Sequence, residues 1–385
     1  MLCCGGMENK YIKDNAFTSP ELNNLCHHQN SDNKLKYMEN KYGKILGDIT
    51  NVIHKGYNNT NKKSQIEYNQ DPTELDLNLS SFNSNCYEEE NFKELIQGYL
   101  PHHHLGEIIG QGGFGKVYHV SSYKSNRKYA VKFLKNKESF EQEYQILSVV
   151  TKLQNEYFCK IYRAHCSSDG AFFVLSLQGK NLKCIMNGLA KKRFSGSSGL
   201  RIGYQMLEAI KYFHSTGYIH RDIKLSNFVL SSENDTKIKL IDFGICRAYK
   251  RRGKIIELGT SRKPKRYIGT LHYCSLPIHN LTPASPRDDI ESWFYSCMQA
   301  LQGKVPWYKC RKEDYEIVKY MKEELRTWEC EQIDASKYRT IFPLLQKIDK
   351  LGYYDEINYQ QYQNHLEKIM SANDIKMDDS YDWQN

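Results

Sequence analysis

Charged and amide side chains interrupt an otherwise apolar stretch of the chain, YIHRDIKLSNFVL, at Tyr218–Leu230. Apolar runs of this kind are normally buried, so the polar residues inside this one need an explanation. Asp222 and Asn227 are five residues apart with Lys224 between them, and a predicted hairpin returns Asp242, of the sequence DFG, beside them. Two carboxylates and an amide then converge as they would around metal-bound phosphates. The stretch therefore predicts a loop whose apolar residues hold its polar groups in place.

A glycine-rich segment, IIGQGGFGKVYHV, begins at Ile108 and precedes this loop. Gly110, Gly112 and Gly115 form a G-x-G-x-x-G pattern, which by itself fits dinucleotide-binding folds, kinases and plain hairpins. The alternation over Lys116–Val120 predicts a strand, whereas a dinucleotide-binding fold would need a helix there. Because glycines carry no side chain, the backbone N–H groups of such a hairpin can close over phosphates. The segment therefore predicts a phosphate-covering hairpin.

The next strand is predicted at Lys128–Leu134, with the sequence KYAVKFL. Its period of two places Ala130 and Lys132 on one face, which suits an adenine ring with phosphates beyond it. A helical pattern follows, and Glu143 on that helix could reach Lys132 as an ion pair. Glu141 is the weaker choice, because it points about 200° away around the helix.

Together, HRDIKLSN, DFG and the glycine hairpin resemble the signature of eukaryotic protein kinases. The resemblance implies an α+β, two-lobed fold, with a small β-rich lobe at about 101–175 and a larger helical lobe at about 180–385. It implies that ATP and Mg²⁺ bind between the lobes and that the γ-phosphate passes to serine or threonine of protein substrates. The alternative from another class is a pseudokinase scaffold without catalysis, and the complete set of lysine and metal-binding residues argues against it.

The resemblance also implies a role for each catalytic residue. Lys132 contacts the α- and β-phosphates and pairs with Glu143. Asp222 orients the substrate hydroxyl and accepts its proton. Lys224 is typical of serine/threonine kinases, and Thr270 contacts Asp222 from the substrate-binding loop.

The same resemblance implies the ligands of the cofactor. Asn227 and Asp242 hold Mg²⁺. The hinge between the lobes lies near 176–178. The residues expected around the nucleotide are Ile109, Gly110, Gly112, Gly113, Gly115, Val117, Ala130, Lys132, Ser176 and Leu177.

A narrower resemblance comes from the second half of the chain. GTLHYCSLP at Gly269–Pro277 lacks the usual Ala-Pro-Glu and resembles the casein kinase I group, as do PRDDIESWFY at Pro286–Tyr295 and GKVPWYK at Gly303–Lys309. VLSLQGKNL at Val174–Leu182 looks closest to the tau-tubulin kinase branch, and NYQQY at Asn358–Tyr362 and the closing DSYDW are similar to it. This resemblance covers roughly residues 100–385.

Three further expectations concern substrates and the catalytic loop. Asp289 is expected to brace that loop from a buried helix. Arg247–Arg266 carries nine basic residues against one acid, which predicts attraction of acidic protein substrates. The resemblance to the tau-tubulin kinase branch leaves cytoskeletal proteins as a further candidate class. His272 stands where casein kinase I relatives use an arginine to bind an acidic or phosphate group. We therefore expect it to titrate at about pH 6–8, which leaves the need for phosphorylated substrates open.

The first hundred residues differ in composition from the rest. They contain sixteen Asn, no Arg, ten Lys and fourteen Asp or Glu, with only short apolar clusters. Such a segment cannot bury enough surface to offset its ordering entropy, so residues 1–100 are predicted to be a disordered extension. Removal of residues 1–95 is then expected to leave stability and activity nearly unchanged. The kinase domain is assigned to 101–385.

The cysteines and the hydropathy of the chain indicate in which cell compartment the protein is expected. The twelve cysteines lack CxxC pairs, which predicts reduced thiols in the cytoplasm, with the nucleus as the alternative. No window reaches the ~18 apolar residues of a membrane helix. The start of the sequence lacks the layout of a signal peptide. Specific nucleic-acid binding is not expected, because no stacking-aromatic module accompanies the basic charge. The sequence leaves the oligomeric state open.

Overall fold

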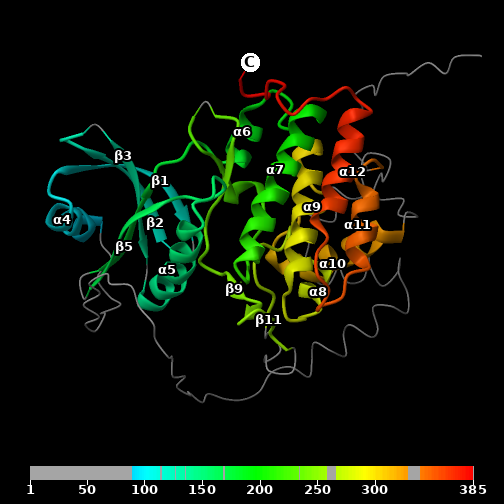
Figure 1. The fold of residues 1–385 in the computed structure, drawn as a ribbon, viewed down its shortest axis with the longest axis horizontal. Helices are drawn as coiled ribbons and strands as arrows, with labels where there is room; N and C mark the ends of the chain where they lie inside the picture. Colours follow the sequence, from blue (N-terminus) through cyan, green and yellow to red (C-terminus); the bar gives the residue numbers. More distant parts are fainter. Residues whose placement is uncertain are drawn as a thin grey trace, which may run out of the picture. The chain divides into compact units, whose positions relative to one another are not determined.

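The computed structural model describes residues 89–384, except 113–114, 126, 135, 168–169, 234, 258–265 and 328–338. Gly113 of the predicted nucleotide-binding set lies outside the described residues, as do residues 1–88 and the centre of the basic stretch. Within the described part, a β-rich lobe at the left of Figure 1 precedes a helical lobe at the right. This is the two-lobed α+β architecture that the sequence resemblance implied.

The β-rich lobe contains a five-stranded antiparallel sheet with the strand order β1-β2-β3-β5-β4. Its strands are β1 (His103–Gly112), β2 (Gly115–Ser122), β3 (Lys128–Leu134), β4 (Ile161–Ser167) and β5 (Gly170–Ser176). Helix α5 (Lys137–Lys152) lies between β3 and β4 in the chain. Asn136 caps its N-terminus, and the Asn136 side chain accepts a hydrogen bond from the backbone N–H of Ser139.

Helix α4 (Glu89–Tyr99) precedes the sheet and corrects the predicted domain boundary. Leu95, Ile96 and Leu100 are buried in one apolar cluster with sheet residues that include Val131 and Phe133. The apolar residues of this short helix cover the face of β3 opposite Lys132, so its packing depends on the sheet and not on its own composition. The folded lobe therefore begins before residue 101, within the segment predicted to be disordered.

We expect this helix to stabilise the lobe measurably. Ile96→Ala removes a side chain that is 1% exposed, and such truncations cost about 2–5 kcal/mol of unfolding free energy. In a domain of this size the melting temperature should fall by roughly 4–20 °C. Gln97→Ala, at an exposed position of the same helix, is the matched control and should change it little. Equal melting temperatures for the Ile96→Ala and wild-type proteins would restore the boundary at residue 101.

The helical lobe is built around α9 (Pro286–Gln302), which is buried on nearly all sides. Ser285 and Asp288 form a capping box at its start, and Gly303 ends it in the left-handed conformation. A Cβ on Gly303 would lie 2.6 Å from the backbone oxygen of Lys192. The other helices of this lobe are α6 (Leu182–Gly188), α7 (Gly196–Ser215), α8 (Leu276–His279), α10 (Tyr315–Thr327), α11 (Phe342–Asp349) and α12 (Tyr359–Ser371).

Short strand pairs carry the loops between α7 and α8. They are β6 (Tyr218–Ile219) with β9 (Arg247–Ala248), β7 (Phe228–Leu230) with β8 (Ile238–Leu240), and β10 (Lys250–Arg251) with β11 (Lys254–Ile255). The β7–β8 pair is the hairpin predicted from the sequence.

The final residues of the chain dock on α7. Arg201 of that helix is fully buried, donates hydrogen bonds to the backbone oxygens of Asp379 and Ser380, and stacks on the ring of Tyr381. Tyr381, from the DSYDW sequence, is itself buried. Among the described residues, no helix combines the length and the apolar character that crossing a membrane would require.

Candidate active site

The loop that carries Asp222 is anchored by its apolar residues. Ile219 is buried before the loop, Ile223 and Leu225 are fully buried within it, and Phe228 is fully buried after it. These side chains alternate with the polar ones, so the backbone is fixed while the polar groups point elsewhere. The buried apolar residues therefore fix the loop and the polar residues between them are held in place by it, as the sequence predicted.

Both carboxylate oxygens of Asp222 accept hydrogen bonds. Lys224 Nζ donates to Oδ2 over 2.7 Å, and Asn227 Nδ2 donates to the same oxygen over 3.2 Å. Thr270 Oγ1 donates to Oδ1 over 2.7 Å and accepts from Lys224 Nζ over 2.8 Å. Four predicted site residues are thus brought together in one hydrogen-bonded group. The group can hold a carboxylate in a defined orientation beside an incoming hydroxyl.

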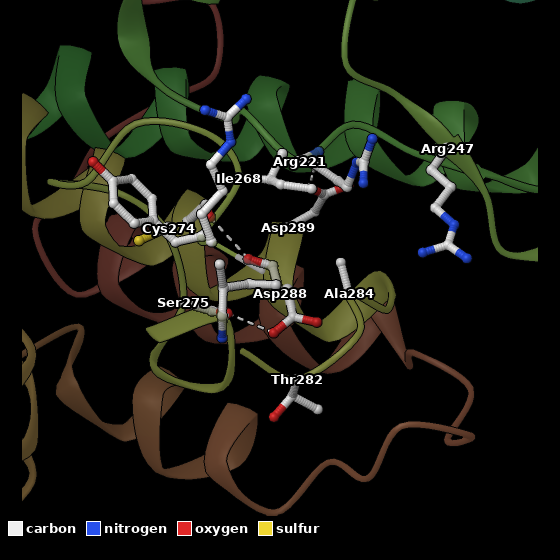
Figure 2. A pocket seen from close by; sticks show the side chains of 13 residues that line it. Arg221, Arg247, Ile268, Cys274, Ser275, Thr282, Ala284, Asp288 and Asp289 are labelled. Atoms are coloured by element: carbon white, nitrogen blue, oxygen red, sulfur yellow. Dashed lines mark hydrogen bonds between the residues drawn. The ribbon is translucent and has the colours of Figure 1, made fainter. Parts of the chain in front are cut away.

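Asp289 of α9 lies directly beneath this loop (Figure 2). Its carboxylate accepts the backbone N–H groups of His220 over 2.6 Å and Arg221 over 2.7 Å, and His214 Nε2 lies 2.8 Å away. Burial alone would raise the pKa of Asp289. The hydrogen bonds and charges of His214 and His220 have a larger combined effect, so the pKa is lowered. Arg221 has a φ of 67°, a conformation uncommon for a side-chain-bearing residue, and Asp289 holds its N–H there.

Lys132 joins the two lobes. Its Nζ lies 2.6 Å from Oε1 of Glu143 on α5 and 3.0 Å from Oδ1 of Asp242 in the helical lobe. Burial alone would lower the pKa of Lys132, but the two carboxylates outweigh it and raise the pKa, so the ammonium stays charged. Glu141 is instead exposed and pairs with Lys137. In the structure, therefore, Glu143 and not Glu141 is the helix carboxylate beside Lys132.

Asp242 and Asn227 offer oxygen donors of the kind that Mg²⁺ prefers. The backbone N–H of Ile241 donates to the backbone oxygen of Asn227 over 3.0 Å, which ties the two positions together. The Asp242 side chain keeps 33% of its surface exposed, and its φ of 69° turns it out of the adjoining strand. Burial alone would raise the pKa of Asp242, but Lys132 outweighs it and lowers the pKa. The pair fits a magnesium site.

The described part of the glycine hairpin is open on one side. A Cβ on Gly112 would meet no atom within 4 Å, and one on Gly110 would make only ordinary contacts with Val117. Gly115 differs, because a Cβ there would lie 1.7 Å from the backbone oxygen of Phe133. Gly112 and Gly110 thus leave room for a ligand, while Gly115 is needed for strand pairing.

The remaining predicted nucleotide-binding residues lie on strands around Lys132. Val117 pairs with Lys132 across β2 and β3, and Ala130 pairs with Leu175 across β3 and β5. Ile109 is 46% exposed on β1. Ser176 ends β5, and its backbone oxygen accepts a hydrogen bond from the side chain of Gln178. Leu177 follows it in the connection to the helical lobe.

The segment that delivers Thr270 approaches the catalytic loop closely. Gly269 has a φ of 95°, and a Cβ there would lie 2.3 Å from the backbone oxygen of Arg221. Only glycine permits this approach without displacement of the loop. Sequence reasoning noted the glycine only as part of a motif.

Sequence reasoning missed the ion pair that anchors the end of this segment. Oε1 of Glu291 on α9 accepts the backbone N–H of Leu276 over 2.9 Å and pairs with Arg326 on α10 over 2.8 Å. Ser275 is also fixed, because its hydroxyl donates to Asp288 over 2.5 Å. The signal that could have found this pair is the acid within PRDDIESWFY, but its partner is 35 residues away.

His272 does not have the electrostatics expected of a phosphate-binding residue. Its Nε2 is buried without a hydrogen-bond partner among the described residues. Burial, followed by the charge of Lys322, lowers the pKa of His272. This lowering favours the neutral imidazole, whereas a bound phosphate would raise the pKa. The buried, unpartnered nitrogen and the lowered pKa both argue against the prediction that His272 senses pH between 6 and 8.

Comparison with known proteins gives a consistent result. A family described as protein kinase domain matches residues 103–371. The chain is 28% identical over 285 residues to a serine/threonine-protein kinase of Dictyostelium discoideum, covering 72% of this chain and 55% of that relative. It is 27% identical over 289 residues to the serine/threonine-protein kinase spe-6 of Caenorhabditis elegans, covering 72% and 74% of the two chains.

A third relative is a casein kinase I homolog of Encephalitozoon cuniculi. It is 30% identical over 288 residues, covering 72% of this chain and 88% of the relative. The chain spans about half the length of the Dictyostelium relative and most of the Encephalitozoon one.

Proposed function

The chain belongs to the protein kinase family, and we propose that it transfers the γ-phosphate of ATP to serine or threonine hydroxyls of protein substrates. One observation carries the proposal. In the helical lobe, one hydrogen-bonded group contains Asp222, Lys224, Asn227 and Thr270. Asp242 lies in the same lobe, and Lys132 of the β-rich lobe donates a hydrogen bond to it. Phosphoryl transfer requires mainly such placement of charge around the reacting groups.

In this proposal each residue has a separate task. Asp222 orients the substrate hydroxyl and accepts its proton while the hydroxyl oxygen bonds to the γ-phosphorus and the bond to the bridging oxygen of ADP breaks. Lys224 and Thr270 hold that carboxylate through the contacts of 2.7 Å. Lys132 binds the nucleotide phosphates, and Glu143 keeps it in place. Asn227 and Asp242 would hold Mg²⁺, which supplies neutralisation of the phosphate charge when bound.

We also propose a subgroup and a substrate class. The casein kinase I homolog among the relatives and the Ser275–Pro277 replacement of Ala-Pro-Glu support membership of the casein kinase I group, with the tau-tubulin branch resting on sequence motifs alone. Acidic substrates are supported by charge, whereas cytoskeletal ones rest on the resemblance to the tau-tubulin branch alone. Arg221 and Arg247, labelled in Figure 2, line one pocket beside the catalytic loop, and Arg266 also lines it.

A cytoplasmic or nuclear location is part of the same proposal. The cysteines among the described residues are free thiols, which suits a reducing compartment.

Peptide phosphorylation by the purified chain tests the proposal. With ATP and Mg²⁺ we expect phosphate transfer to serine and threonine peptides and none to tyrosine peptides. The kcat/KM should be higher for acidic peptides than for neutral ones. The basic side chains of residues 247–266 attract acidic groups that come within a Debye length, about 8 Å at physiological salt. Replacing exposed Arg251 and Arg252 with serine should lower this preference about three-fold.

The control for the charge effect is Lys192→Ser, which removes an exposed cation after α6 and should leave the preference unchanged. Absence of transfer to any peptide would favour the scaffold alternative. Equal kcat/KM for acidic and neutral peptides would remove only the substrate class.

A further inference from the structure

Lys322 is a buried lysine of α10 whose surroundings are unusual. Its side chain is fully buried, and the atoms that accept its hydrogen bonds include no carboxylate among the described residues. Nζ donates to the backbone oxygens of Leu271 over 3.0 Å and Cys274 over 2.6 Å, and to Nε2 of His279 over 3.1 Å. Cys274 Sγ lies at 4.0 Å as a fourth, weaker acceptor, so all three N–H groups of the ammonium have partners.

Aromatic rings complete the enclosure of this ammonium. Nζ lies 4.8 Å from the ring centre of Tyr295 and 5.3 Å from that of Trp307. Such rings attract a cation that has lost its water. Burial lowers the pKa of Lys322 to about 8, so the ammonium still predominates at pH 7. His279 beside it is neutral, because burial and then the charge of Lys322 lower its pKa to about 2.

The two backbone oxygens belong to the segment that directly follows Thr270. Thr270 donates to Asp222, so the segment 271–274 begins beside the catalytic carboxylate. Between them, the backbone oxygen of His272 accepts from Trp307 Nε1 over 2.8 Å, and Tyr273 donates through its hydroxyl to Gln299 over 2.7 Å. Side chains of α9, α10 and the residues between them thus hold the segment, and the ammonium of Lys322 hydrogen-bonds to its first and last residues.

The charge of Glu291 favours the ammonium form of Lys322, but no carboxylate among the described residues accepts a hydrogen bond from it. Burying an ammonium without a directly bonded carboxylate is costly, and an apolar residue would fill this position without that cost. A lysine at this position is therefore explained if its hydrogen bonds to the segment have a role that an apolar side chain could not fill. We propose that Lys322 is a positioning residue for the protein substrate: its ammonium holds the segment 271–274 in the conformation that receives the peptide next to Asp222. This inference rests on the proposed kinase function.

Lys322→Met tests the proposal in the full chain. The variant keeps the apolar stem and removes the three donors, so the segment loses the Lys322 hydrogen bonds at its two ends and keeps those to Trp307 and Gln299. We expect kcat/KM for a serine peptide to fall at least ten-fold. KM for ATP should stay within about two-fold, because Lys132 and Asp242, the residues proposed to bind the phosphates and Mg²⁺, pair with each other and not with Lys322. A residue that only stabilises the lobe would not separate peptide from nucleotide in this way.

The matched control is Lys319→Met, one turn earlier on α10, where the side chain is partly exposed. It should change neither parameter. Lys322→Gln keeps two N–H donors without the charge, and it serves if the methionine variant does not fold; its peptide kcat/KM should still fall at least three-fold.

The outcomes separate the two claims. No phosphate transfer by the wild-type chain would reject the proposed function itself. An active wild-type chain with unchanged peptide kcat/KM in the Lys322 variants would reject the positioning role. Parallel losses for peptide and ATP, with a lowered melting temperature, would show Lys322 to be structural and would reject it as well.

Discussion

Replacing Asp222 with asparagine should lower the rate of phosphate transfer at least ~10²-fold without unfolding the chain. The substitution keeps the size of the side chain but removes the charge that accepts the substrate proton. It also turns an amide toward Lys224 and Thr270, which both donate to the wild-type carboxylate. Initial rates with a serine peptide measure the loss, and the melting temperature checks the fold.

Asp378→Asn is the matched control for that experiment. Asp378 is exposed near the end of the chain, and the same change of chemistry there should leave the rate within about two-fold. Full activity in the Asp222→Asn protein would contradict the proposed catalytic role and favour another base.

Asp289→Ala should be the most destabilising single substitution near the site. It would leave the backbone N–H groups of His220 and Arg221 buried without an acceptor and would remove the partner of His214. Breaking a buried charged network in this way typically costs about 3–5 kcal/mol. The melting temperature should therefore fall by roughly 6–20 °C, and activity should fall with it, because Arg221 adjoins Asp222. Glu323→Ala, on the exposed face of α10, should have little effect.

The pH dependence of stability in a second variant, Asp289→Asn, gives a second readout. The pKa of Asp289 is lowered on folding, so its carboxylate adds stability above the unfolded pKa of about 3.9, and this stability is lost as the pH falls through the folded value. Denaturant unfolding should thus show a large difference between wild type and Asp289→Asn at pH 7 that shrinks below about pH 4. A difference that stays constant over this range would show that the charge of Asp289 is not what stabilises the loop.

Much of the catalytic loop was predictable because its parts are close in the chain. Asp222, Lys224 and Asn227 lie within six residues, and a single hairpin returns Asp242 to them. The spacing of Lys132 and Glu143 on a strand and the next helix was also readable, since strand and helix periods determine which side chains can meet. The family resemblance added Thr270 and Asp289, whose contacts with this loop cannot be read from local spacing.

The first limit of such reasoning is shown by α4. Its four apolar residues are too few to stabilise a helix alone, and the Asn-rich composition around them predicts disorder. The sheet face formed by Val131 and Phe133 supplies the missing contacts. Whether such a segment folds is thus decided by a surface that the segment itself does not encode.

The second limit concerns charges. In the sequence, Lys322 lies among charged residues of an amphipathic helix and looks like a solvated surface lysine. Glu291 and Arg326 likewise give no local sign of being partners across 35 residues. The sequence by itself determined which residues carry the chemistry, because those lie in contiguous motifs. Only the tertiary structure decided which charges are buried and what they hold, because burial depends on packing between segments that are distant in the chain.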